Sequence, residues 1–326
     1  MKFLLSAVLV AGSLISSSAW PQPAAGSLDV HWDEGAEDCK ASTQPPIQVH
    51  AYNAQTFILR ENLCVTFEAP FMYLLIGSTK ALLIDSGDVV DAKQPALAES
   101  VMQLLPGEGA AKMPLIVAHT HRHLDHRAGD SQFEHLPNVR VVGFELDKVK
   151  QYFGFTDWPN GVAQIDLGDR TVDVLPTPGH NETHIGLYDR NTGLFFSGDF
   201  LMPGRLLIDD TEADLASAKR VVDFVKDRPV SHVLGGHIEF DVAGEPFEWQ
   251  SQHHPREHAL QLTKNDLLAL PQAIGSFNGF YTRSGNFLLM NPTRNLVVVC
   301  VAALVILVAI VMGLRRYLRH RRRMRG

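Results

Sequence analysis

The segment Thr120-His121-Arg122-His123-Leu124-Asp125-His126 is the densest cluster of metal-binding side chains in the chain. Imidazole and carboxylate groups are ligands that zinc and similar divalent ions accept. His121 and His123 lie two residues apart, so on an extended turn both rings point the same way and can coordinate one ion. Asp125 and His126 begin the next element and can face a second ion beside the first. A solvated histidine-rich patch is the alternative interpretation of this segment taken alone.

Three further motifs follow at wider spacing. His180, in Thr-Pro-Gly-His, lies 57 residues after His123; Asp199, in Ser-Gly-Asp, follows 19 residues later; and His237, in Gly-Gly-His, another 38. Here the sequence resembles the metallo-β-lactamase-fold hydrolases, whose pattern is Thr-His-x-His-x-Asp-His, Pro-Gly-His, Gly-Asp and Gly-His in this order. The resemblance covers about residues 50–245 and fills all seven ligand positions.

The resemblance implies an αββα sandwich, within the α/β (α+β) class, with the site at one edge. It assigns one ion to His121, His123 and His180, the other to Asp125, His126 and His237, and a bridging role to Asp199. We expect two Zn²⁺ ions, with iron or manganese as alternatives. Asp85 matches a family aspartate that supports the site from behind the ligands, although a plain turn residue before Ser86-Gly87 is equally natural.

Such a site suits hydrolysis. Two ions about 3.5–4 Å apart share a hydroxide formed near neutral pH, while one ion polarises the scissile carbonyl or phosphoryl oxygen. Asp125 is expected to be catalytic as well as a ligand, because a metal-bound carboxylate stays ionised and can receive or relay the proton. No serine or cysteine nucleophile is then required.

The chain departs from the family pattern beside His180. Asn181 stands where Thr is frequent, and Thr183 where Gly is common, so we expect the adjoining turn to differ. His184 is expected to pack or to support the site, with substrate contact as the alternative.

Other basic residues near the motifs carry weaker signals. Arg122, Arg127 and Arg205 are expected to be surface arginines, although each could meet an anionic substrate. His253 and His254 are expected to be solvated, because no Cys or carboxylate accompanies them at ligand spacing. The pocket walls are expected to come from the loops 200–210 and 238–256, with 150–162 as a further contributor.

These motifs lie in a domain of mixed strands and helices, predicted over residues 47–274. Each motif follows an apolar run, and strand ends that feed loops on one sheet edge are where such folds gather chemistry. Strands are predicted at 72–76, 81–85, 115–118, 139–142, 172–175, 185–188, 194–196 and 233–234. Helices are predicted from Pro95 to about 105, from Thr211 to about 225 and over 256–274.

Both ends of the chain are apolar. Residues 1–19 combine a basic start, a short apolar core and small residues, which predicts a signal peptide. An irregular lead-in is expected over 20–46 and a juxtamembrane linker over 275–295. Residues 296–314 are 19 residues without a charge, enough for a transmembrane helix, and seven arginines follow in the tail 315–326. The arginines place the tail in the cytoplasm and the domain outside, in bacteria at the inner membrane facing the periplasm.

The net charge indicates which partners to expect, and the location of the cysteines bears on disulfide formation. The chain carries −7, and removing the seven tail arginines and Lys2 leaves about −15 for the exported part. We therefore expect a small-molecule substrate and no nucleic-acid partner. Cys39 and Cys64 lie in the exported part, where a disulfide is permitted, although two free buried cysteines are the alternative. The oligomeric state stays open, as does later removal of the C-terminal segment as a sorting tail.

The function these features favour is an exported, membrane-anchored dinuclear zinc hydrolase acting on an ester, thioester or lactone. The ligand set resembles that of the glyoxalase II and lactonase branches of the family. A β-lactamase is the first alternative, although those enzymes typically have Cys or Ser where this chain has Asp199. His123 argues against an oxygen or nitric-oxide reductase, in which Glu would be usual. A non-catalytic binding protein that retains the fold is the remaining alternative.

Overall fold

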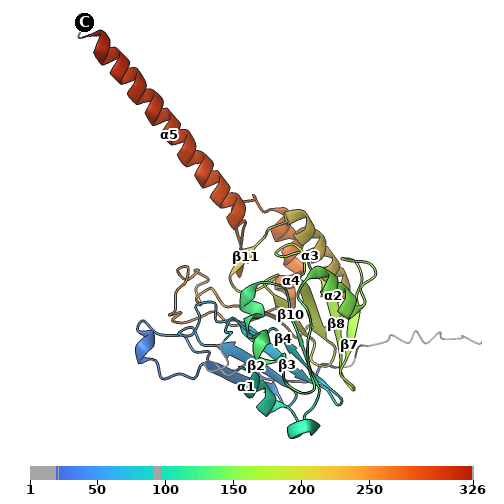
Figure 1. Cartoon of the computed structure of the whole chain (residues 1–326). Coiled ribbons are helices and arrows are strands. Elements are labelled where there is room, and N and C mark those ends of the chain that lie inside the picture. Colours follow the sequence, from blue (N-terminus) through green and yellow to red (C-terminus); the bar gives the residue numbers. More distant parts are fainter. Residues whose placement is uncertain (1–19, 21, 91–96, 325–326) are drawn as a thin grey trace, which may run out of the picture.

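The computed structural model describes residue 20 and residues 22–90 and 97–324 (Figure 1). The predicted signal peptide over residues 1–19 and the predicted helix start at Pro95 lie outside these residues. Two six-stranded sheets form the body of the protein, and the long helix α5 projects from it next to β11.

The first sheet has the strand order β1-β2-β3-β4-β5-β6. Its first four strands form an antiparallel meander, and β4, β5 and β6 are parallel. The strands are β1 (Ile47–Asn53), β2 (Thr56–Glu61), β3 (Phe71–Ile76), β4 (Ala81–Ile84), β5 (Leu115–Ala118) and β6 (Val139–Val141). The strands predicted at 72–76 and 81–85 are therefore present, as the antiparallel pair β3 and β4.

The second sheet has the order β13-β12-β10-β9-β8-β7. Strands β8, β9 and β10 are antiparallel neighbours, whereas β12 lies parallel to β10. The strands are β7 (Ala163–Asp166), β8 (Thr171–Pro176), β9 (Ile185–Asp189), β10 (Leu194–Gly198), β12 (His232–Gly235) and β13 (Gln261–Leu262). All the strands expected from apolar runs are present in these two sheets.

Alternation of side chains along the strands creates three apolar layers. In β4, Leu82 and Ile84 pack between the sheets against residues such as Val174 and Phe196. Leu83, on the opposite face, packs with Val101 of α1 (Leu97–Leu104). A strand buried on both faces reads as a continuous apolar run, as the Leu-Leu-Ile of β4 does.

Helices cover the outer faces of both sheets. The second sheet is covered by α3 (Thr211–Val225) and α4 (Lys264–Gly275), whose apolar residues share one cluster with Phe195 and Val233. The layer order is thus αββα, as the family resemblance implies. The shorter α2 (Leu146–Phe153) adds Val149 to the layer between the sheets.

The helix predicted over 256–274 begins eight residues later, at Lys264. Thr263 and Asp266 form a capping box there, with reciprocal side-chain and backbone hydrogen bonds that satisfy the exposed N–H groups. The preceding residues are held by a tertiary contact instead, because Glu257 forms a buried bidentate ion pair with Arg60. The prediction of helix over 256–263 is therefore wrong.

The predicted linker over 275–295 also contains ordered structure. It forms the hairpin β14 (Tyr281–Ser284) and β15 (Phe287–Met290), and β15 pairs in parallel with β11 (Arg205–Leu207). One residue after β15, α5 runs from Pro292 to Arg323 with Asn291 as its N-cap. The apolar side chains of α5 are exposed, and the helix is long and apolar enough to cross a membrane.

The lead-in is largely irregular, as expected, but it is fixed to the body. Trp32 is buried with its ring edge-to-face on Phe71, at 4.9 Å between centroids. Cys39 and Cys64, for which the sequence left a disulfide and two free cysteines as alternatives, form the disulfide, with the two Cα atoms 5.1 Å apart. These contacts join residues 20–46 to the first sheet.

Candidate metal centre

The seven predicted ligands converge at one edge, where strands of both sheets end. His121 and His123 follow β5, His180 follows β8, Asp199 follows β10 and His237 follows β12. Within the second sheet β8, β10 and β12 run in the same direction, so their carboxyl ends meet there. Asp125 and His126 lie in a short 3-10 turn, Leu124–His126, which carries them across the same edge.

Glycines allow this close approach. A Cβ on Gly236 would lie 2.5 Å from Oδ1 of Asp199 and 2.8 Å from a ring carbon of His126. Gly198 has a φ of +49°, and its Cβ would lie 2.8 Å from the side chain of Thr120. The Gly-Asp and Gly-His motifs therefore need glycine because no side chain fits beside the ligands.

The first group comprises His121, His123 and His180. Nε2 of His121 lies 2.8 Å from Nδ1 of His123, and Nε2 of His180 lies 3.2 and 3.0 Å from those two atoms. Three imidazole nitrogens therefore point at one position, the arrangement expected around a shared ion.

The second group comprises Asp125, His126, Asp199 and His237. Oδ2 of Asp125 lies 3.3 Å from Nε2 of both His126 and His237. Oδ1 of Asp199 lies 3.4 Å and 3.6 Å from the same two nitrogens. Its other oxygen faces the first group, 3.8 Å from Nε2 of His121 and 3.6 Å from that of His180. Asp199 therefore lies between the two groups.

The chemistry of the donor set fits divalent ions. Nδ1 of His180 donates to the carbonyl of Leu207, and Nδ1 of His237 to that of Glu68, each at 2.7 Å. With Nδ1 held by a backbone carbonyl, Nε2 of each ring is the nitrogen left to bind an ion. Oδ1 of Asp199 is buried without a hydrogen-bond partner, although a buried carboxylate oxygen is costly to leave unpaired. A bound cation would satisfy it.

Burial and charge set the protonation of the ligands. Burial lowers the pKa of His121 and neighbouring imidazoles lower it further, which keeps this ring in the neutral form that coordinates. Burial alone would raise the pKa of Asp125, but His126 and His237 outweigh it and hold that pKa below its usual range. Burial lowers the pKa of His237, but the carboxylate of Asp199 outweighs burial and raises that pKa to about 10. The carboxylates of the second group therefore favour positive charge at His237.

Asp85 supports the site from behind, as the resemblance implies. Its carboxylate accepts hydrogen bonds from the backbone N–H of Thr120 at 2.6 Å and from its hydroxyl at 2.9 Å. It also lies 2.8 Å from Nδ1 of His126. Asp85 is 1% exposed and has a φ of +65° just after β4, so the turn aims its side chain at the ligand.

The turn after His180, in which the chain departs from the family pattern, is held by side-chain hydrogen bonds. The side-chain oxygen of Asn181 accepts from the N–H and the hydroxyl of Thr183, and its amide lies 3.3 Å from Nε2 of His123. His184 is fully buried, stacks on His121 with ring centroids 5.0 Å apart, and meets the hydroxyl of Thr177 at 2.7 Å. The packing role expected for His184 is therefore the one observed.

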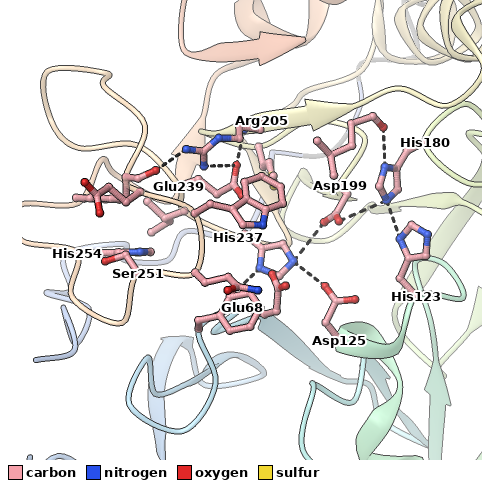
Figure 2. Close-up of a pocket in the computed structure, with 18 residues that line it drawn as sticks. Glu68, His123, Asp125, His180, Asp199, Arg205, His237, Glu239, Ser251 and His254 are labelled. Carbon is pink, nitrogen blue, oxygen red and sulfur yellow. Dashed lines mark hydrogen bonds and ion pairs between the residues drawn. The ribbon is translucent and has the colours of Figure 1, made fainter. Parts of the chain in front are cut away.

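A cavity of about 200 Å³ opens onto both groups (Figure 2). The loops 200–210 and 238–256 line it as expected, through residues such as Arg205, Phe247 and Trp249. Residues 150–162 contribute none of the described lining residues. Phe67 and Glu68, from the connection between β2 and β3, were not predicted, because no spacing signal links them to the metal-binding motifs.

The basic residues near the motifs differ in their surroundings. Arg205 is largely buried, 3.5 Å from Glu239 and stacked over Trp249, so the expectation of a surface position is wrong for it. Arg122 is exposed and paired with Glu182, as expected of a surface arginine. His254 is 6% exposed, with its ring stacked on Phe247. Its expected solvation is therefore wrong.

The metal-binding motifs agree with the comparison of the chain with known families. The model of the metallo-beta-lactamase superfamily matches residues 65–237, just over half of the chain. The chain belongs to this superfamily. Membership confirms the fold family and the class of metal-dependent hydrolase that the motifs predict.

Several superfamily members resemble the chain in sequence or structure. Acyl-coenzyme A thioesterase MBLAC2 of Gallus gallus is 27% identical over 199 residues, which are 51% of this chain and 72% of that protein. A hydroxyacylglutathione hydrolase of Synechococcus sp. is 33% identical over 135 residues, 41% of this chain and 50% of that protein. The structure of a metallo-beta-lactamase from Pontibacter korlensis matches with a TM-score of 0.45 and 16% identity, covering 69% of this chain and 99% of that one.

Proposed function

We propose that this superfamily member is a dinuclear zinc hydrolase that cleaves acyl thioesters or related esters. The observation that carries the proposal is the pair of ligand groups with Asp199 between them. Thioesters are favoured because relatives named as an acyl-coenzyme A thioesterase and a hydroxyacylglutathione hydrolase resemble the chain.

Two zinc ions, when bound, would supply Lewis acidity and a water that loses its proton near neutral pH. His121, His123 and His180 would hold one ion, and Asp125, His126 and His237 the other. Asp199 would contact both, because its two oxygens face opposite groups.

The protein's own side chains would bind and orient the substrate. The cavity lies directly against Asp125 and Asp199, and its apolar wall is formed by Phe67, Phe247 and Trp249. Burial raises the pKa of Glu68, on the same wall, to about 7 despite the opposing charge of His237. In the overall reaction, water adds to the acyl carbon, the carbon–sulfur bond breaks, and the departing thiolate receives a proton. We assign to Asp125 the role of relaying that proton.

We also propose that the enzyme is exported and anchored by α5. The helix is exposed from residue 296 onward, and 19 of its residues, 296–314, carry no charge. The arginines that follow would stay on the cytoplasmic side, which places the metal centre outside. Protease added to sealed spheroplasts should then digest the domain and spare the tail. Digestion of the domain only after the membrane is broken would reverse the orientation.

A substrate panel tests the proposed activity. The purified full chain, loaded with zinc in detergent, is assayed on acyl thioesters, esters, lactones and β-lactams. We expect turnover of a thioester or ester that is lost in His121→Ala, because that substitution removes a ligand. The matched control is His31→Ala, since the His31 side chain is 83% exposed. Turnover confined to β-lactams would instead support the lactamase alternative, and a chain inactive on all four classes would support the binding-protein alternative.

A further inference from the structure

Starting from the proposed function and its anchor, we propose that the active-site mouth faces the membrane and takes substrate from it. The substrate class would be a long-chain acyl thioester or ester that stays partly embedded in the bilayer. The connection between α5 and the metal centre supports this orientation.

A short path of contacts joins the anchor to the first ligand group. Met290, at the end of β15, is separated from α5 by Asn291 alone and pairs with Leu207 at the end of β11. Leu207 lines the cavity, and its carbonyl accepts the hydrogen bond from Nδ1 of His180 at 2.7 Å. One strand pairing and one hydrogen bond therefore separate the start of the anchor from a predicted ligand.

The length of this path places the cavity near the membrane surface. The continuous apolar run of α5 begins at Leu296, six residues after Met290. One extended residue and five helical residues span about 10 Å. The headgroup layer is about 5–8 Å thick on each side of the hydrocarbon core. Leu207, the neighbour of Met290, would therefore lie at the outer surface of the headgroups.

Exposed aromatic side chains lie both at the cavity and in the hairpin that leads into α5. Trp249, at the mouth of the cavity, is 59% exposed, and Tyr281, opposite Met290 in the hairpin, is 53% exposed. The cavity loop is tied to the hairpin by Arg283, which lies 3.1 Å from Glu245 and donates to the carbonyl of Gly244. Tryptophan and tyrosine are enriched where a protein meets the headgroup region.

The size of the cavity favours a substrate whose tail stays outside. At about 200 Å³ the cavity is smaller than the 300–1,000 Å³ typical of pockets that enclose a drug-sized ligand. It can hold the reacting acyl end but cannot enclose a long chain. Each methylene that remains in the bilayer keeps about 0.8 kcal/mol of favourable transfer free energy. A long acyl chain in the membrane would therefore reach the metal centre without leaving it.

A spacer experiment on the full chain in phosphatidylcholine vesicles tests the proposal. Ten Gly/Ser residues inserted after Asn291 should move the domain about 17 Å outward on average. We expect palmitoyl thioester hydrolysis in the vesicles to fall at least about five-fold relative to butyryl thioester hydrolysis, because the tether no longer holds the mouth at the surface. The control carries the same ten residues after Arg323, which leaves the distance unchanged. An unchanged palmitoyl-to-butyryl ratio in the Asn291 insertion overturns the proposal.

A second measurement needs no enzymatic activity, so it separates this proposal from the proposed function. Lipids brominated near the headgroup end quench tryptophan fluorescence in the reconstituted full chain. Trp249→Phe should remove the largest share of that quenching, whereas Trp20→Phe should not, because Trp20 packs on Arg228 and not on the cavity loop. If butyryl thioester is not cleaved, the proposed function fails while this result still decides the orientation. Quenching that persists in Trp249→Phe overturns the membrane-facing mouth.

Discussion

Replacing Asp85 by Asn should weaken one metal position and leave the backbone in place. The carboxylate of Asp85 serves three hydrogen-bond donors, two on Thr120 and one on His126. An amide offers one acceptor oxygen and a donor NH₂ group, so at least one of those donors would face another donor. Asn also tolerates the positive φ of this position better than Ala or Val would. The substitution therefore tests the interaction with His126 rather than the turn.

The size of the effect follows from these contacts. A hydrogen bond to a charged group contributes about 1.5–3 kcal/mol, and both Asp85 and His126 are buried. Loss of a carboxylate that orients a metal-binding histidine typically weakens metal binding about 10–100-fold, which corresponds to about 1.4–2.7 kcal/mol. The two estimates agree. Zinc affinity of the second group should fall by this factor, while that of the first group should be retained.

Competition with a chromophoric chelator measures both zinc affinities, and thermal unfolding checks the fold. Asp130→Asn is a matched control, because Asp130 lies 2.8 Å from Nε2 of His119, which is not a predicted ligand. Unchanged zinc affinity in a folded Asp85→Asn variant would refute the supporting role of Asp85. An equal loss in Asp130→Asn would show that the effect is not specific to the ligand.

Three further changes probe the bridge, a buried acid and the disulfide. Asp199→Ser should sharply lower the occupancy of one ion and thioester turnover, as measured by metal analysis and kinetics; unchanged values would favour a lactamase-like site. Burial, with a smaller contribution from Asp210, raises the pKa of Asp214 to about 8 from an ordinary value of 3.8. Folding therefore disfavours its ionisation, so stability should fall as pH rises from about 4 to 8, by up to about 5 kcal/mol. Asp214→Asn should flatten that slope in urea unfolding with chelator present, and parallel slopes would contradict the assignment. Serine at both Cys39 and Cys64 should lower the free energy of unfolding by about 3–4 kcal/mol in the chain-entropy model, whereas reduction without effect would refute it.

The positions of the metal ligands are predictable from the sequence because each follows an apolar run. A buried strand such as Leu115–Ala118 must end where the chain meets solvent, and parallel neighbours bring those ends together. The pairing of β11 with β15 was not predictable, since 83 residues separate Arg205 from its partner Leu288 and neither segment alone has a distinctive pattern. Tertiary contacts of this kind also determine the environment of His254.

Tertiary contacts likewise determine the burial and the conformation of residues outside the metal-binding motifs. Arg205 resembles any surface arginine in sequence, but Glu239 and Trp249 enclose it once β11 is paired. By contrast, the late start of α4 has a local signal in the sequence, namely the capping box of Thr263 and Asp266. Residues 256–262 are held by the ion pair of Glu257 with Arg60, a partner 197 positions away.

The dependence of hydrolysis on bound metal tests the central claim most directly. The purified full chain is stripped with a chelator, dialysed and titrated with zinc while thioester hydrolysis and bound zinc are measured on the same samples. Activity should be absent in the metal-free protein and should rise to a plateau at about two zinc ions per chain, as in two-metal hydrolytic sites. Full hydrolytic activity in the metal-free chain, or saturation at two ions without hydrolysis of any acyl substrate, would contradict the account.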